Sequence, residues 1–246
     1  MIAITNLSKI YQIGDETVHA LDHASLHVSE GEFVSIIGPS GSGKSTFLRC
    51  LNLLEMPTAG SVVFEGTDIT DPHVNINKHR QRMGMVFVKP VLFSHLNIIE
   101  NVMIGMMDLK GMNKENAYEK ARTLLAKVGI ADKAEAYPEQ LSAGKKQLAT
   151  IARAFSLDPE VLLLDEPTTN VDPIMKGGVE TLIKDYAKLG NTVVIVSHEK
   201  ELLNSVCDRI IYMKAGRIIE EGPKEKMINC PEHAEVKEFL ELLLTS

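Results

Sequence analysis

The sequence lacks several features that mark secreted, membrane-spanning or nucleic-acid-binding chains. Its three cysteines, Cys50, Cys207 and Cys230, are widely spaced and form no CxxC pair, which predicts reduced thiols rather than disulfides or a metal centre. No stretch approaches the roughly 20 consecutive apolar residues that cross a bilayer, and the N-terminus lacks the basic and apolar regions of a signal peptide. The net charge is -7, and no Lys or Arg cluster offsets it. We therefore expect a cytosolic chain that binds no nucleic acid.

The most informative stretch is glycine-rich and reads Gly38-Pro39-Ser40-Gly41-Ser42-Gly43-Lys44-Ser45-Thr46. It follows the apolar run 33–37 and precedes a stretch with helical spacing over 47–54, which predicts a strand, a loop and a helix. Glycines let successive backbone N–H groups converge on an anion, and a helix N-terminus favours negative charge. In such a motif Lys44 can reach the β- and γ-phosphates of a nucleotide, and the Ser45 hydroxyl can ligate Mg²⁺. The sequence therefore predicts a nucleotide site.

Two further apolar runs end in titratable residues. Residues 161–164 lead into Asp165 and Glu166, and residues 192–196 lead through a serine into His198. Fully apolar strands are typical of a parallel sheet covered on both faces, in which ligands bind at the carboxyl ends of the strands. We expect Asp165 to hold Mg²⁺, Glu166 to accept the proton of the attacking water, and His198 to hydrogen-bond the γ-phosphate. Residues that merely cap an element or face solvent would give the same sequence pattern. That alternative is less favoured here, because two strands end in titratable residues and a phosphate loop follows a third strand.

The length suits one large α/β domain or two small ones, and the composition is that of a globular protein with a packed core. The pattern predicts strands and hairpins over residues 1–30 and a helix-rich block over residues 89–158, which interrupts a nucleotide-binding core of residues 1–88 and 159–246. Tyr11 stands in a polar turn before the phosphate loop. It could stack on a purine, but on its position alone a partly buried tyrosine that caps a hairpin is the better interpretation.

The ordered set of motifs resembles the ATPase subunit of an ATP-binding-cassette (ABC) importer over residues 1–246. Gly38–Ser45 matches the Walker A loop of that family, and Leu162–Glu166 matches Walker B with its catalytic glutamate. Leu141-Ser142-Ala143-Gly144-Lys145 stands where the family has its Leu-Ser-Gly-Gly-Gln signature, Asn170-Val171-Asp172 where it has the D-loop, and His198 where it has the switch histidine. The resemblance implies a P-loop NTPase fold with a mostly parallel buried sheet, an N-terminal antiparallel β subdomain and an inserted helical subdomain.

The same resemblance implies ligands and partners. It makes Tyr11, together with Val18, a contact of the adenine, which reverses the interpretation drawn from position alone. The implied working unit is a head-to-tail homodimer, in which Ser142 and Gly144 of one subunit cover the ATP on the phosphate loop of the other, and Asp172 joins the nucleotide-binding set. ATP and Mg²⁺ would be the ligands. Hydrolysis would drive transmembrane permease subunits contacted by the helical block, and indirectly a solute-binding protein, at the inner face of the cell membrane.

Three segments resemble the polar amino-acid uptake group: Leu51–Glu55, Leu92–Leu96 and Glu220–Pro223. The chain stops soon after Pro223, from which we expect no appended regulatory domain. ATPases of exporters and of cell division share every core motif and remain alternatives. Soluble ABC ATPases that act on DNA or ribosomes usually carry two cassettes or long coiled-coil insertions, which this sequence lacks.

Four positions depart from the family pattern. Val88 stands where the family has a glutamine that contacts Mg²⁺ and the attacking water, Ala143 replaces a glycine, Lys145 a glutamine and Leu148 an arginine. Because valine has no polar atom, we expect nearly normal ATP binding with slow turnover. A water in place of the missing amide, or the charge of Lys145, would oppose that loss. The alternative is a nucleotide-dependent regulatory or weakly active subunit.

Overall fold

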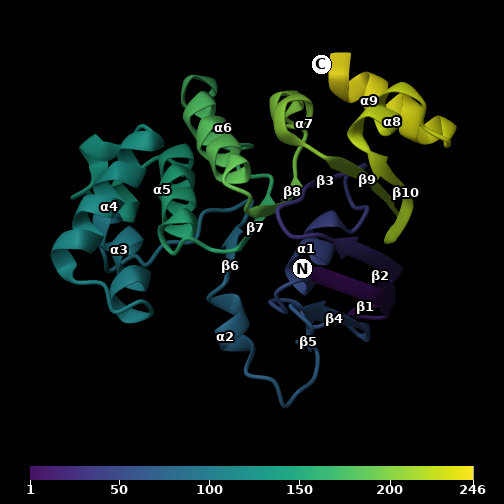
Figure 1. Ribbon diagram of the computed structural model, residues 1–246, viewed down its shortest axis with the longest axis horizontal. Helices are drawn as coiled ribbons and strands as arrows, with labels where there is room; N and C mark the ends of the chain where they lie inside the picture. Colours follow the sequence, from purple (N-terminus) through teal and green to yellow (C-terminus); the bar gives the residue numbers. More distant parts are fainter. Residues whose placement is uncertain (246) are drawn as a thin grey trace. The chain divides into compact units, whose positions relative to one another are not determined.

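The computed structural model describes residues 1–245, which group into two compact units (Figure 1). Unit 1 joins residues 1–80 to the chain from residue 190 onward, and unit 2 comprises residues 81–189. The functional boundaries predicted from the sequence, with a helical subdomain over residues 89–158, stay a prediction. Within residues 1–245, no helix combines the length and the apolar character needed to cross a bilayer.

The first sheet of unit 1 is antiparallel. Its strands are β1 (Ile2–Ile13), β2 (Glu16–Val28), β4 (Ala59–Phe64) and β5 (Thr67–Asp68), in the order β2-β1-β4-β5. Apolar side chains such as Ile2 and Ile4 alternate with more exposed ones along β1, so one face of the sheet is buried. In the hairpin of β1 and β2, Tyr11 lies directly opposite Val18. The antiparallel N-terminal β subdomain expected from the sequence is confirmed.

The second sheet of unit 1 carries the phosphate loop. Its strands are β3 (Phe33–Ile37), β8 (Thr192–Val196), β9 (Arg209–Lys214) and β10 (Arg217–Pro223). β3 is parallel to both β8 and β9, and β10 pairs with β9 antiparallel. Every residue of β3 and β8 is buried, as expected for parallel strands covered on both faces. The helices of this unit are α1 (Lys44–Cys50), α2 (Ile76–Arg80), α7 (Lys200–Val206), α8 (Lys224–Asn229) and α9 (Ala234–Thr245).

Helix α1 is shorter than its sequence pattern suggests. The helical spacing extends to Leu54, but the helix ends at Cys50 and a turn follows. Arg80 explains part of this end, because its guanidinium donates to the carbonyls of Asn52 (3.0 Å) and Leu53 (2.7 Å). These carbonyls are thereby satisfied without a further helical turn.

Unit 2 combines two parallel strands with a cluster of helices. Strand β6 (Met83–Val86) pairs with β7 (Val161–Asp165) in parallel, with Val86 opposite Leu164. The helices are α3 (Ile98–Asp108), α4 (Lys114–Lys127), α5 (Ala143–Ser156) and α6 (Pro173–Lys188), with 3-10 turns η1 (Ala131–Lys133) and η2 (Pro138–Gln140). Helices α3, α4 and α5 pack against one another, as Figure 1 shows in teal. The helix-rich block of the sequence is therefore present, and it begins at α3 behind an Asn97 capping box.

Candidate functional site

The phosphate loop of unit 1 connects β3 to α1 and is supported from behind. Gly43, the N-cap residue of α1, has a φ of 97°. A Cβ added there would lie 2.3 Å from the carbonyl oxygen of Ala20 in β2. The neighbouring Ser42 carbonyl accepts a hydrogen bond of 3.0 Å from the N–H of Gly216, in the turn between β9 and β10. The loop conformation is thus set by contacts with two hairpins as well as by its own glycines.

Replacing Gly43 with Ala should cost stability through both backbone strain and a clash. The left-handed conformation alone costs a non-glycine residue about 1–2 kcal/mol, and the missing space beside Ala20 adds to it. The matched control is Gly14→Ala, since Gly14 also has a positive φ (62°) but nothing within 4 Å of an added Cβ. Thermal unfolding should show the larger loss for Gly43→Ala, and only that variant should weaken nucleotide binding. Equal effects of both substitutions would contradict this account of the loop.

The front of the loop is open, and a buried cation lies beneath it. Gly41 has nothing within 4 Å of an added Cβ, and both Ser40 and Gly41 are exposed. Lys44 is only 7% exposed, and its ammonium donates to the carbonyls of Gly38 (2.7 Å) and Pro39 (2.8 Å) and to the hydroxyl of Ser42 (3.3 Å). A buried positive charge next to an accessible glycine loop fits an anion with several oxygens, such as a polyphosphate.

Tyr11 lies near the residue that ends the phosphate loop motif. The side chains of Thr46 and Glu55 interact with its hydroxyl, and the ammonium of Lys9 lies 4.9 Å from the centre of its ring. Burial is the main cause that raises the pKa of Tyr11, so the phenol stays neutral. Val18, across the hairpin, is 40% exposed. An aromatic ring and an exposed aliphatic side chain therefore stand together beside the loop, as an adenine contact would require.

His198 follows β8 and is exposed, and its ring lies against the C-terminal helix. The ring centre is 6.2 Å from that of Phe239 in α9, and Phe239 in turn lies 5.4 Å from Tyr212 in β9. Sequence reasoning found His198 but missed Phe239. The amphipathic spacing of the last helix was the only sequence signal for Phe239. That spacing predicts which side chains face inward, but not which residue each of them contacts.

Asp165 and Glu166 occupy different environments in unit 2. Asp165 ends β7 and is completely buried, whereas Glu166 is half-buried and has a φ of 44°. A left-handed backbone at a glutamate is uncommon and concentrates at functional sites. The hydroxyl of Thr169 donates to the Glu166 carboxylate over 3.0 Å, which helps to orient it. The two neighbouring carboxylates therefore differ in burial, and the backbone turns at the second of them.

The signature and D-loop segments supply helix caps. The Ser142 hydroxyl oxygen accepts from the N–H of Lys145 at the start of α5 (3.4 Å), and the Asp172 carboxylate accepts from the N–H of Ile174 at the start of α6 (2.9 Å). Ser142 and Ala143 are exposed. Leu148, by contrast, is fully buried within unit 2, so its apolar character has a packing reason.

Each unit therefore brings together one part of the predicted site. Unit 1 contains the phosphate loop, Tyr11, Val18 and His198, and unit 2 contains Asp165, Glu166, Ser142, Gly144 and Asp172.

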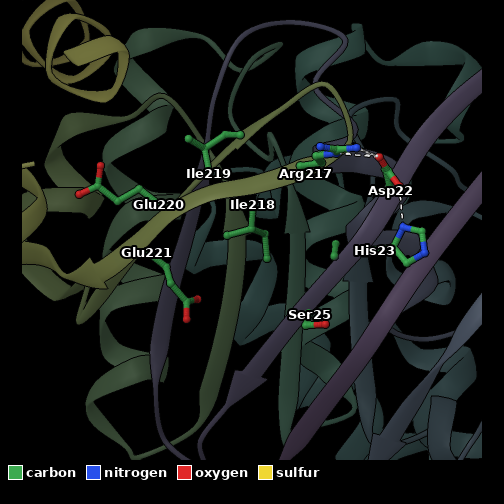
Figure 2. Close-up of a pocket in the computed structure, with 9 residues that line it drawn as sticks. Asp22, His23, Ser25, Arg217, Ile218, Ile219, Glu220 and Glu221 are labelled. Carbon is green, nitrogen blue, oxygen red and sulfur yellow. Dashed lines mark hydrogen bonds and ion pairs between the residues drawn. The ribbon is translucent and has the colours of Figure 1, made fainter. Parts of the chain in front are cut away.

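Sequence reasoning also missed a cluster of three paired side chains, Asp22, His23 and Arg217, which supports the phosphate loop indirectly. Asp22 in β2 pairs with Arg217 in β10 (Nε to Oδ2, 2.6 Å) and with His23 (Nδ1 to Oδ1, 2.6 Å), at one end of a groove of about 530 Å³ (Figure 2). His23 and then Arg217 lower the pKa of the Asp22 carboxyl by hydrogen bonding. The N–H of Asp22 also donates to the carbonyl of Gly216, whose own N–H binds the loop at Ser42. The cluster of Asp22, His23 and Arg217 therefore holds the turn at Gly216, and this turn supports the phosphate loop.

Comparison with known proteins identifies the family. Residues 21–169, which are more than half of the chain, match the ABC transporter family. The chain belongs to the ABC transporter family. It is similar to the arginine transport ATP-binding protein ArtM of Bacillus subtilis, with 43% identity over 99% of this chain and 100% of that protein. It is also similar to the glutamine transport ATP-binding protein GlnQ of Escherichia coli, with 44% identity over 98% of this chain and 99% of that protein.

Solved structures agree with this ABC transporter assignment. The ATP-binding cassette MJ0796, in a dimeric post-hydrolysis state bound to ADP and Pi, superposes with a TM-score of 0.84 and 34% identity. The match covers 91% of this chain and 99% of that chain. The α/β fold, the family and the ATPase class that the sequence predicted are confirmed, and ATP is the nucleotide of this family.

Proposed function

We propose that this ABC ATPase powers a membrane importer for polar amino acids and works as a head-to-tail homodimer. The observation that carries the proposal is full-length similarity above 40% to relatives named for arginine and glutamine transport. Nearly complete coverage of those relatives supports a like role for the whole chain, with permease subunits and indirectly a solute-binding protein as partners. The chain would then lie peripherally on the inner face of the cell membrane.

In this proposal the chain's own residues bind and orient ATP. Lys44 and the N–H groups of the phosphate loop bind the β- and γ-phosphates, and Tyr11 with Val18 contacts the adenine. Glu166 accepts the proton of the attacking water, and His198 donates a hydrogen bond to the γ-phosphate. These assignments are supported by the open loop over a buried ammonium and by the strained turn that orients Glu166.

Ser45 and Asp165 would hold Mg²⁺. A hydroxyl and a carboxylate are hard oxygen ligands, which suit this ion, and the ion neutralises charge that develops on the phosphate oxygens. In residues 1–245 no group of three or more His, Cys, Asp or Glu is placed to hold a metal. A cation held partly by the nucleotide's phosphates would need only one or two protein ligands, and Ser45 and Asp165 would supply them.

The second copy would complete the nucleotide site. Ser142 and Ala143 are exposed at the start of α5, where the hydroxyl and helix N–H groups can face a phosphate on the partner subunit. Ile174, in the first turn of α6, is 92% exposed, which suits burial in an interface. The dimeric state of the similar cassette MJ0796 supports this arrangement.

An apolar groove of unit 2 suits a permease helix. It has a volume of about 390 Å³ and lies between β6, α3 and α5, with Met83, Phe93, Ile104, Leu109 and Leu157 among its lining residues. Phe93 and Leu109 are 45% and 52% exposed. A helix with an apolar stripe fits such a groove, with anchors spaced three or four residues apart.

Leu109→Asp should therefore weaken permease binding by at least about tenfold, because it places a charge at an apolar contact. The ATPase rate of the isolated chain should not change. The matched control is Leu189→Asp, an exposed leucine outside the groove, which should bind permease normally. Binding is measured with permease subunits of a polar amino-acid importer in detergent or nanodiscs.

Reconstitution tests the proposed function itself. Vesicles that contain the chain, those permease subunits and their solute-binding protein should take up a polar amino acid only with Mg-ATP. Hydrolysis by the chain without stimulation by any such permease would favour another ABC transporter type.

A further inference from the structure

The two residues that follow β6 in unit 2 are held through their backbone carbonyls. The carbonyl of Phe87 accepts a hydrogen bond of 2.8 Å from the side-chain amide of Gln147 in α5. The next carbonyl, that of Val88, accepts one of 3.1 Å from the side-chain amide of Asn170. Two successive carbonyls are thus bound by side chains that lie 60 and 82 residues away in the sequence.

The segments that carry the two donors meet at the start of α5. A Cβ added at Gly144 would lie 2.6 Å from the carbonyl oxygen of Asn170, so the first turn of α5 touches the backbone of the segment that carries Asn170. The signature helix, the residues before α6 and the turn after β6 therefore interlock at three contacts. A shift of one segment must change at least one hydrogen bond of the others.

Gln147 gives an independent sign that this contact is specific. Its side chain is fully buried, and its Oε1 has no hydrogen-bond partner in the described part of the chain. An unsatisfied buried acceptor is costly, and an apolar residue of similar volume would avoid it. The amide is therefore useful for its donor, which binds Phe87, rather than for packing alone.

The held turn lies beside the predicted catalytic carboxylate. Because Val86 is opposite Leu164 in the parallel pair of β6 and β7, the chain leaves β6 next to Asp165 and Glu166. Asn170 also follows Thr169, whose hydroxyl binds the Glu166 carboxylate. Contacts that fix Phe87 and Val88 thus fix the surroundings of Glu166 as well.

We infer that Gln147 and Asn170 are positioning residues, which hold the turn at residues 87–88 in place for hydrolysis through its main-chain carbonyls. The inference rests on the proposed role of Glu166. It explains how this turn keeps a defined place although Val88 offers no polar side-chain atom.

The main test is Asn170→Asp, which keeps the shape but replaces the donor by an acceptor that faces the Val88 carbonyl. Asn170 is exposed, so the variant should fold. We expect kcat for Mg-ATP to fall by about 2- to 10-fold, the effect of one neutral hydrogen bond, with KM and the nucleotide Kd unchanged. The matched control is Asn229→Asp, because exposed Asn229 also donates to a carbonyl, that of Glu225 over 2.9 Å, within α8. It should leave kcat unchanged.

Two further measurements make the result decisive. Gln147→Leu combined with Asn170→Asp should be non-additive in kcat, since both residues hold one turn. Hydrogen exchange should become faster at residues 87–91 in Asn170→Asp but not in Asn229→Asp, whether or not the chain hydrolyses ATP. A folded Asn170→Asp with unchanged kcat, or with unchanged exchange, would overturn the inference. If the parent chain does not hydrolyse ATP, but exchange at residues 87–91 is still faster in Asn170→Asp than in the parent, the result would count against the proposed function and not against the positioning role.

Discussion

Replacing Glu166 with Gln is expected to lower single-turnover ATP hydrolysis by about 10²–10⁴-fold, the usual effect of losing a general base. An amide cannot accept the proton of the attacking water, but it has nearly the same shape. Its oxygen can still accept the hydroxyl of Thr169, which now bonds to the carboxylate over 3.0 Å. The substitution therefore tests basicity rather than position. Rapid mixing of excess protein with Mg-ATP measures the chemical step directly.

The matched control is Glu160→Gln. Glu160 immediately precedes the first residue of β7, whereas Glu166 follows the last. Glu160 is exposed and pairs with Arg82 over 2.6 Å, and that hydrogen bond lowers the pKa of its carboxyl. Loss of such a surface pair costs no more than about 1 kcal/mol, so hydrolysis should be unaffected. Glu166→Gln should also accumulate an ATP-bound dimer in size-exclusion experiments. If Glu166→Gln hydrolyses ATP at the parent rate, a group other than Glu166 must accept the proton of the attacking water.

The parts of the site that could be predicted are those specified by local sequence. The strands β3, β7 and β8 are short apolar runs, and each is buried along its whole length. Such runs, followed by a glycine-rich loop or by titratable residues, indicate both the sheet and the edge where a ligand binds. The phosphate loop motif also indicates that the ligand is a nucleotide, because a lysine at the end of a glycine-rich loop between a strand and a helix is typical of nucleotide sites.

The parts that could not be predicted depend on contacts between distant segments. Asp172 was expected to contact nucleotide, and within the chain its carboxylate caps α6. Nothing near Gln147 in the sequence indicates that its amide would bind the carbonyl of Phe87. A sequence shows which donors exist, but the carbonyl that each one meets is fixed by packing, because backbone acceptors are alike at every residue.

Val88→Gln is expected to speed hydrolysis by up to about 10²–10³-fold, the value of one preorganised contact to a reacting phosphate. The side chain of Val88 has no polar atom and is half-buried, and the Val88 carbonyl accepts a hydrogen bond from Asn170. A glutamine would therefore extend from a backbone that is already in place beside Asp165 and Glu166. The matched control is Val88→Met, which adds a similar length without an amide and should leave the rate unchanged. Nucleotide Kd should be similar in all three proteins.

A rate equal to that of the parent would mean that water or another residue already supplies the contact, and the slow-turnover prediction would then be wrong. If Val88→Gln is faster, the cause can be located with the Glu166→Gln background. A glutamine that orients the attacking water acts together with the base that takes its proton, and residues that act as a unit are strongly non-additive. Adding Val88→Gln to Glu166→Gln should therefore restore little hydrolysis. An undiminished acceleration in that background would place the effect of residue 88 on the phosphates instead of the water.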